Sequence, residues 1–174
     1  TFLGAGSSIG PEDIQNQQIV GNKIAYLEGY LWDNENAKKA MKKMVDICKA
    51  DDQLIAFTLS DLFCVDRHRD SFKELIENDV DILFANEDEI AAMCQSSSFE
   101  DSVDYAKSLN MIVAITRAAK GSIIVNKNSL IEVNPVQVDK VVDTTGAGDL
   151  YAAGFLYGLA KEKDLSTSGQ YASV

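Results

Sequence analysis

Small residues and acidic side chains stand together in the run DTTGAGD at residues 143–149. The small residues let backbone N–H groups turn toward one point, and the apolar stretch at 150–159 that follows is typical of a buried helix. Unpaired N–H groups and the positive dipole end at the start of such a helix attract an anion. Asp149 lies in the first turn, within reach of an acceptor hydroxyl. The pattern indicates phosphate-transfer chemistry; on spacing alone, a structural glycine turn with Asp149 as an ordinary first-turn carboxylate stays open.

The string DTTGAGD resembles the C-terminal signature of the ribokinase-like (PfkB) carbohydrate and nucleoside kinases. This resemblance implies that the backbone of Gly146, Ala147 and Gly148 forms an anion hole for the transferred phosphoryl group, and that Asp149 is the catalytic base. It implies ATP and Mg²⁺ as cofactors, and a sugar or nucleoside with a hydroxymethyl group as the acceptor. The chain is therefore expected to be, or to derive from, a kinase with an alcohol group as acceptor.

A second candidate is the segment NEDE that starts at Asn86. On spacing alone it is a capping box, in which Asn86 caps a helix and Glu89 takes the return position. The segment also resembles the family's NxxE motif, which implies that Asn86 and Glu89 tune Mg²⁺ and phosphate binding, usually through water. Mg²⁺ prefers oxygen ligands and keeps several of its waters, so the same residues can serve both purposes.

The segment TRAAKG at residues 116–121 resembles the family's nucleotide-side segment, commonly Thr-x-Gly-x-x-Gly, with Ala118 in place of the first glycine. The resemblance implies that Thr116 and Arg117 reach the ATP phosphates and that Gly121 makes room for a turn. It gives a nucleotide-binding role to Thr145 as well. Arg117 is the most valuable cation in an acidic chain.

Two further polar residues have open roles. Asp61 either lines the phosphate region or serves as a helix cap, and the sequence favours neither. The lone His68 is expected to face solvent at a helix start.

The pattern of apolar residues predicts the elements that position these groups. Strands and helices alternate until a hairpin interrupts the rhythm, and the order argues for an open, mostly parallel α/β sheet with three αβα layers. Ligands bind beyond the carboxyl ends of the strands in such sheets, and Asp61, Asn86 and Thr116 all follow strands. The expected strands are residues 23–30, 53–59, 80–85, 111–116, 121–125 and 129–133; the expected helices are residues 36–50, 66–78, 86–95 and 98–109 and the helix after the glycine turn.

Composition limits the possible partners. The 174 residues carry 46% hydrophobic and 25% charged side chains, as in an ordinary globular protein, and a net charge of −11. Such a charge repels nucleic acid and anionic membranes, and no apolar run approaches the length of a membrane span. The three cysteines form no CxxC pair, so free thiols in a reducing cytoplasm are expected.

The resemblance covers essentially residues 1–174, which are expected to form a single, partial ribokinase-like domain. The resemblance implies a much longer protein, so the chain is interpreted as an internal fragment without the N-terminal strands and lid and without the last helices that close the ATP pocket. Uncovered sheet edges invite pairing, so we expect a homodimer or other self-association through the exposed edge. The alternative function is a non-catalytic nucleotide- or anion-binding fragment that lacks the acceptor site. A dinucleotide-binding dehydrogenase and a Walker-type NTPase are disfavoured because GxGxxG after an early strand and GxxxxGK[ST] are absent from the sequence.

Overall fold

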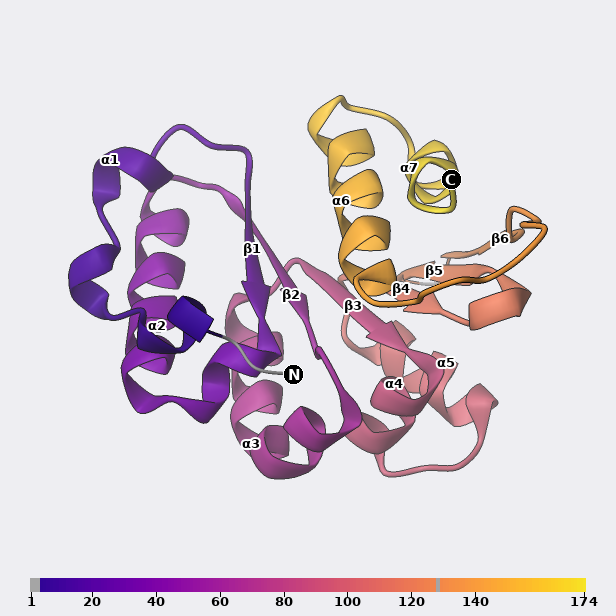
Figure 1. The fold of residues 1–174 in the computed structure, drawn as a ribbon, viewed down its shortest axis with the longest axis horizontal. Coiled ribbons are helices and arrows are strands. Elements are labelled where there is room, and N and C mark those ends of the chain that lie inside the picture. Colours follow the sequence, from indigo (N-terminus) through magenta and orange to yellow (C-terminus); the bar gives the residue numbers. More distant parts are fainter. Residues whose placement is uncertain (1–3, 128) are drawn as a thin grey trace.

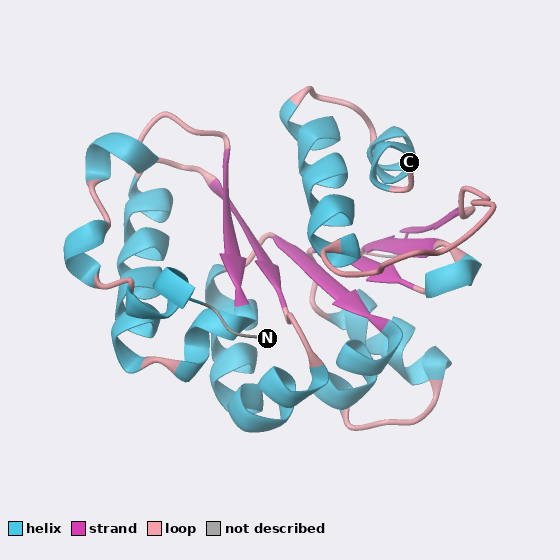
Figure 2. Cartoon of the chain, in the orientation of Figure 1, coloured by secondary structure: helices cyan, strands magenta, loops and turns pink. Residues whose placement is uncertain are grey.

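The computed structural model describes residues 4–127 and 129–174 and arranges them in layers around one sheet (Figures 1 and 2). The sheet has six strands in the order β1-β2-β3-β4-β5-β6. The β1–β2, β2–β3 and β3–β4 pairs are parallel, and the last two pairs form antiparallel hairpins. The strands are β1 (Ile24–Glu28), β2 (Leu54–Thr58), β3 (Ile82–Asn86), β4 (Ile112–Thr116), β5 (Ser122–Asn126) and β6 (Ser129–Val133).

Helices cover both faces of this sheet, which confirms the predicted three-layer α/β fold (Figure 1). One face carries α2 (Glu35–Ala50), α3 (Leu62–Asp79), α4 (Glu87–Cys94) and α5 (Phe99–Ser108), with the short α1 (Asn16–Ile19) beside α2. The other face carries α6 (Ala147–Ala160) and α7 (Leu165–Ala172). Short 3₁₀ turns occupy Gly4–Ser8, Pro11–Asp13, Gly29–Asp33 and Ala118–Lys120.

Alternate side chains of the central strands supply two cores. In β2, Ile55 and Phe57 pack toward α2 and α3, while Ala56 between them packs on the opposite face. Strands buried on both faces become continuous apolar runs, which is why β2 and β3 are clear in the sequence. Phe84 anchors the second core, where its ring meets Phe155 of α6 edge-on at 5.6 Å between centroids. This core fixes α6 against the sheet.

Helix α3 begins earlier than the sequence pattern indicates. The expected start was residue 66, but the helix runs from Leu62 because the Asp61 carboxylate accepts a hydrogen bond from the Cys64 N–H at 2.7 Å. Leu62 and Phe63 in the first turn are exposed, so they break the apolar stripe that marks the rest of the helix. The cap role left open for Asp61 is confirmed.

Helix α7 packs closely on α6 because glycines leave room for it. A Cβ atom built at Gly154 would lie 2.6 Å from the Tyr171 carbonyl oxygen, and one at Gly158 would lie 2.5 Å from Ser168 Oγ. Gly169 on α7 similarly faces Ile124 and Val133 of the hairpin. Helix α7 therefore packs on both α6 and the hairpin and holds α6 against the sheet.

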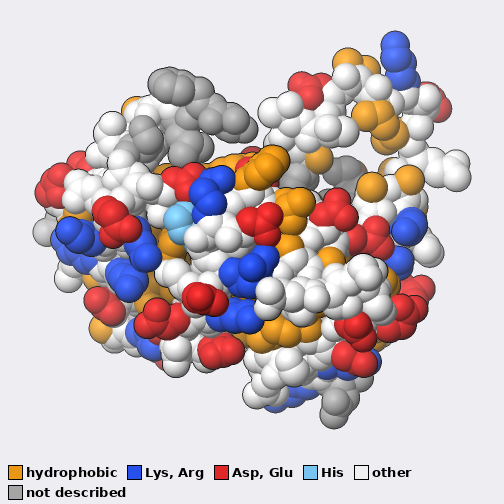
Figure 3. Space-filling model, turned by 90° about the horizontal axis from the view of Figure 1, so that it is seen from below, with side chains coloured by type: hydrophobic (Ala, Val, Ile, Leu, Met, Phe, Trp, Pro, Cys, Tyr) orange, Lys and Arg blue, Asp and Glu red, His pale blue; other side chains and the backbone are white. Residues whose placement is uncertain are grey.

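Seen from below relative to Figure 1, the surface of the molecule mixes acidic and basic side chains with scattered apolar ones (Figure 3). Among the described residues, no helix combines the length and the apolar character that crossing a bilayer requires.

We expect the substitution Gly154→Ala to lower the free energy of unfolding by about 1–3 kcal/mol, because the added methyl group meets the α7 backbone. This loss should exceed the gain of up to about 1 kcal/mol that alanine has over glycine within a helix. Chemical denaturation measures it. Gly148→Ala in the first turn of the same helix is the control, since a Cβ there meets nothing within 4 Å. If the two substitutions lowered the free energy of unfolding equally, close helix packing would not be the role of Gly154.

Candidate active site

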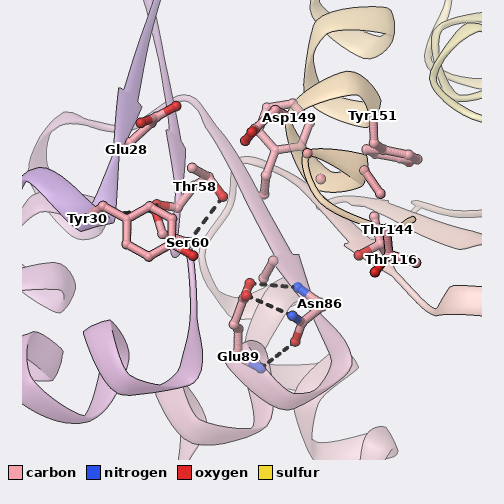
Figure 4. Close-up of a pocket in the computed structure, with 15 residues that line it drawn as sticks. Glu28, Tyr30, Thr58, Ser60, Asn86, Glu89, Thr116, Thr144, Asp149 and Tyr151 are labelled. Carbon is pink, nitrogen blue, oxygen red and sulfur yellow. Dashed lines mark hydrogen bonds between the residues drawn. The ribbon is translucent and has the colours of Figure 1, made fainter. Parts of the chain in front are cut away.

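A cavity of about 180 Å³ opens at the carboxyl ends of the parallel strands, beside the start of α6 (Figure 4). It draws residues from the ends of β1 to β4 and from the glycine turn, so five segments far apart in the sequence meet there. Its lining residues are Glu28, Tyr30, Thr58, Ser60, Phe84, Ala85, Asn86, Glu89, Thr116, Thr144, Gly146, Ala147, Gly148, Asp149 and Tyr151. We call this space the acidic cavity, after its three carboxylates.

The glycine turn presents unpaired amides to this cavity. Gly146 caps α6 with φ +76°, a left-handed conformation that favours glycine. The Ala147 N–H donates to the Thr144 carbonyl at 3.1 Å and so is already used within the turn. The N–H groups of Gly148 and Asp149 have no acceptor among the described residues. The amides available to an anion are therefore those of Gly148 and Asp149, at the positive end of the α6 dipole.

Asp149 extends its carboxylate into the acidic cavity rather than into the protein interior. The residue is exposed, and its side chain points from α6 across the opening toward β1 (Figure 4). There the Asp149 carboxylate interacts electrostatically with the carboxylate of Glu28, the last residue of β1. Burial and the charge of Asp149 raise the pKa of Glu28 above its usual range, and the same two causes raise the pKa of Tyr26.

Asn86 and Glu89 form the predicted capping box at the start of α4. The Glu89 N–H donates to Asn86 Oδ1 at 2.9 Å, and the Asn86 N–H donates to Glu89 Oε2 at 2.9 Å. Asn86 Nδ2 also donates to Glu89 Oε1 at 2.7 Å. Glu89 is only 6% exposed, and burial raises its pKa to about 7 although the Asn86 N–H opposes the shift. Each carboxylate oxygen keeps a lone pair for a further donor or a cation.

The wall opposite α6 is formed by the turn after β1 and the turn after β2. Ser60 has a left-handed φ of +71°, rare for a residue with a side chain, and its hydroxyl accepts the Tyr30 N–H at 3.2 Å. Burial and the neighbouring charge of Asp61 raise the pKa of Tyr30 to about 12, so its hydroxyl stays protonated at neutral pH. This wall presents the hydroxyl groups of Tyr30 and Ser60 and the carboxylate of Glu28 to a polar ligand.

A second cavity of about 410 Å³ lies on the other side of the glycine turn, and we call it the neutral cavity. It shares Asn86, Thr116, Thr144, Ala147, Gly148 and Tyr151 with the acidic cavity, so the start of α6 separates the two. None of the described residues that line it carries a charge. The rest of its lining is Ala118, Gly121, Pro135, Val136, Ala172 and Ser173.

Two backbone positions shape the neutral cavity. Gly121 has φ +84°, and a Cβ there would lie 2.1 Å from the Val133 carbonyl oxygen, so the predicted turn requires glycine. Ala118, which replaces a family glycine, has φ +48°. A left-handed alanine costs roughly 1–2 kcal/mol relative to its preferred conformation. Ala118 therefore adopts a backbone conformation that glycine adopts more easily.

Arg117 and Thr145, predicted as nucleotide-binding residues, line neither cavity. Arg117 Nε donates to Glu87 Oε1 at 2.8 Å, and its guanidinium carbon lies 4.0 Å from the centre of the Phe99 ring. Thr145 is exposed, and its N–H donates to Asp143 Oδ1 at 2.9 Å within the turn. The other predicted site residues line one or both of the cavities. The direct roles of Arg117 and Thr145 in nucleotide binding stay predictions.

His68 is held by protein rather than directed freely into solvent. Its Nε2 lies 2.6 Å from Asp33 Oδ1, and Arg67 contacts both oxygens of the same carboxylate at 2.9 and 2.7 Å. Asp33 ends the 3₁₀ turn that carries Tyr30, so this cluster ties the wall of the acidic cavity to α3.

Sequence reasoning missed several cavity residues: Glu28, Tyr30, Thr58, Ser60, Thr144 and Tyr151. A signal existed for two of them, since Glu28 and Thr58 are paired final residues of neighbouring strands, as Asn86 and Thr116 are. The buried hydrogen bond from the Tyr151 hydroxyl to Ser122 Oγ, 2.8 Å long, leaves no pattern in the sequence.

Comparison with known proteins gives one consistent result. A family described as pfkB family carbohydrate kinase matches residues 2–174. The solved structure of an adenosine kinase from Sinorhizobium meliloti superimposes with a TM-score of 0.93 and 38% identity, covering 96% of this chain and 51% of that one. A nucleoside kinase from Methanocaldococcus jannaschii is 38% identical over 96 residues, 55% of this chain and 31% of the relative. A 5-dehydro-2-deoxygluconokinase from Bacillus licheniformis is 27% identical over 173 residues, 95% of this chain and 53% of the relative. The chain thus spans about half the length of the proteins that it matches along its whole length.

The buried Glu89 predicts a specific pH dependence of stability. Its pKa rises from an ordinary 4.5 to about 7 in the folded state, so the fold favours the protonated form. This contribution is present below pH 4.5 and is lost as the pH rises to about 7, on the order of 3 kcal/mol in total. Unfolding measured without divalent cations should show the loss in the wild type and not in Glu89→Gln. Parallel stability curves for the two proteins would contradict this prediction.

Proposed function

Because the chain belongs to the pfkB family of carbohydrate kinases, we propose that it contains the phosphoryl-transfer centre of an ATP-dependent kinase whose acceptor is a hydroxymethyl group of a sugar or nucleoside. One observation carries this proposal: the unpaired amides of Gly148 and Asp149 and the Asp149 carboxylate face the same cavity. An anion and an acceptor hydroxyl can therefore meet at one point.

The reaction that fits this geometry needs few protein groups, since phosphoryl transfer depends mainly on alignment and charge neutralisation. Asp149 accepts the proton of the acceptor hydroxyl as its oxygen bonds to the γ-phosphorus. The bond from that phosphorus to the bridging oxygen breaks, and ADP leaves with its electron pair. The amides of Gly148 and Asp149 donate to the phosphoryl oxygens, and a fixed donor of this kind stabilises charge without reorganisation. The Ala147 N–H is hydrogen-bonded within the turn, and Gly146 supplies the left-handed backbone conformation that the turn requires.

The two cavities suit the two substrates. The neutral cavity, with Pro135, Val136 and Ala172, offers apolar surface to a nucleotide, and Thr116 stands at its junction with the acidic cavity. The acidic cavity offers carboxylates and hydroxyls to a polyhydroxyl acceptor. Gly121 keeps the neutral cavity open at the turn into β5. We assign the nucleotide to the neutral cavity and the acceptor to the acidic one.

A divalent cation fits the donor set of the site. Asn86 and Glu89 supply hard oxygen atoms, and the carboxylates Glu28, Glu89 and Asp149 have no lysine, arginine or histidine beside them among the described cavity residues. Mg²⁺ would be held near Asn86 and Glu89 largely through its own waters, and it neutralises phosphate charge when bound. Their capping bonds already orient both side chains.

The substitution Asp149→Asn should lower turnover by roughly 10²–10⁴-fold, because a lost acid–base group has about that effect. The fold should be unchanged, since Asp149 is exposed. A coupled assay for ADP release, with circular dichroism on the same samples, measures both. Asp104→Asn is the control, an exposed aspartate on α5 that pairs with Lys107. Unaltered turnover in Asp149→Asn would remove the base assignment.

Calorimetry with ATP–Mg²⁺ and an acceptor panel separates this function from that of a nucleotide- or anion-binding module. Binding with turnover supports the kinase, and binding without turnover of any acceptor supports the module.

We also propose that this polypeptide self-associates through the open edge of β1. Only β2 pairs with β1 among the described strands, and β1 is mostly apolar. The nearby Val20 and Leu54 are 50% and 42% exposed. Sedimentation velocity should show a dimer or larger species that grows with concentration. A stable monomer at high concentration would exclude this mode of association.

A further inference from the structure

The chain that leads into α6 gives the start of this helix no support. After Val133, the last residue of β6, residues 134–145 are exposed, and no residue from 134 to 150 is buried. Among the described residues, the hydrogen bonds of this stretch join only its own residues or those of α6. Tyr151 is therefore the first point at which the chain after β6 is anchored in the core.

The anchor at Tyr151 combines a packed ring with a buried hydrogen bond. The ring lies 6.4 Å from Phe84 and 6.4 Å from Phe155 between centroids. The hydroxyl donates to Ser122 Oγ at 2.8 Å, and Tyr151 and Ser122 are only 8% and 2% exposed. Apolar burial is not directional, so the ring contacts alone allow small rotations of the helix. A hydrogen bond needs its donor and acceptor aligned at a set distance, so the hydroxyl restricts these rotations.

Ser122 is a rigid partner for this bond. It is the first residue of β5 and pairs in register with Thr116 of β4. Gly121 before it has no room for a side chain, and its carbonyl accepts a hydrogen bond from the Arg117 N–H at 2.8 Å. Ser122 is thus fixed both by the turn and by the sheet. The bond from Tyr151 ties α6 to this fixed point.

Tyr151 and Asp149 lie on opposite sides of α6. Residues two positions apart in an α-helix are separated by about 200° around its axis. Figure 4 shows Tyr151 leaving the helix on the side away from Asp149. A rotation of about 10° moves a side-chain tip that lies about 5–6 Å from the axis by about 1 Å. A misplacement of about 1 Å at a reacting centre lowers a rate on the order of 100-fold.

We propose that Tyr151 is a positioning residue for the phosphoryl transfer: its hydroxyl, held by Ser122, fixes the rotation of α6 and thereby the direction in which the Asp149 carboxylate and the free amides point. The inference rests on the proposed function, because it names a further residue on which the same site depends. Burial raises the pKa of the Tyr151 hydroxyl, so it stays protonated and accepts no proton in the reaction. Tyr151 acts through the helix start and needs no contact with the reacting atoms.

Removal of either hydroxyl, and of both, tests the proposal: Tyr151→Phe, Ser122→Ala and the double variant. Each single substitution leaves one buried hydroxyl without its partner and lowers stability, whereas the double variant leaves none, so its stability should return toward that of wild type. Turnover is measured by ADP release with ATP–Mg²⁺ and with adenosine, ribose or fructose as the acceptor, beside chemical denaturation of the same samples. The kcat should fall about 10-fold to 100-fold in all three variants, with KM for ATP close to the wild-type value.

Tyr157→Phe is the matched control, since Tyr157 lies on the same helix and is 57% exposed. It should keep the wild-type kcat. A double variant that regains both stability and kcat shows that the hydroxyl pair serves only the fold, and this result overturns the inference. Unchanged kcat in Tyr151→Phe overturns it too, as does a change confined to KM. If Tyr151→Phe does not fold, Ser122→Ala, which keeps the ring, decides the point.

Amide hydrogen exchange gives a second readout that needs no turnover. The Leu150 N–H donates to the Gly146 carbonyl at 2.9 Å and closes the first turn of α6. Tyr151→Phe and the double variant should speed exchange at residues 150–152 by up to about 10-fold and leave residues 157–160 unchanged. Equal exchange in wild type and variants overturns the inference. If the wild type binds ATP–Mg²⁺ but turns over no acceptor, the kinase function is overturned, and this exchange then decides whether Tyr151 holds the helix start.

Discussion

The site depends on one constraint: the start of α6 must lie over the carboxyl edge of the sheet with its first amides unpaired. Two contacts hold it there from the protein side. The Tyr151 hydroxyl donates to Ser122 Oγ of β5 inside the core, and Phe84 of β3 packs edge-on against Phe155. From the outside, α7 approaches closely at Gly154 and Gly158. Because the helix is held on both sides, its dipole is aimed at a fixed point, and an anion needs no rearrangement of the protein to use it.

Around that point the protein places groups of opposite electrical character. The amides of Gly148 and Asp149 favour an anion, while the carboxylates of Glu28 and Glu89 repel one. The arrangement is costly in the absence of ligands, since a buried carboxylate such as Glu89 is stabilised by protonation when no cation is near. Destabilised groups of this kind concentrate at functional sites, where the ligand supplies the missing charge or donor. In the proposed function, the electrostatics that destabilise the ligand-free site are those that a cation, a phosphoryl group and an acceptor hydroxyl would relieve.

Local patterns in the sequence predicted the strands, most helix bounds and the Asn86–Glu89 box because each depends on residues within a few positions. Strands β2 and β3 are continuous apolar runs, and the box is a four-residue motif. The part of the cavity wall that Tyr30 and Ser60 form could not be read in this way, because it exists only once β1 and β2 pair in register. The left-handed φ of Ser60 and Ala118 also runs against residue preference, so propensity gives no warning of it. The DTTGAGD run indicated a helix-start anion site, but only the turn geometry shows that the Ala147 amide is already used.

Arg117 shows how an ion pair can be compatible with the phosphate-binding role predicted for the same side chain. Its Nε is taken by Glu87, yet its terminal guanidinium nitrogens have no acceptor among the described residues. Partly exposed ion pairs contribute only about 0–1 kcal/mol, whereas charge-assisted bonds from arginine to phosphate are stronger. Asn86 and Thr116 are register partners, and Glu87 and Arg117 are the residues that follow them. The pair therefore joins the two loops that border both cavities and holds the guanidinium next to them. A phosphate that reached Arg117 would replace Glu87, a weak partner, with a stronger one at little cost. The ion pair with Glu87 is therefore compatible with phosphate binding by Arg117.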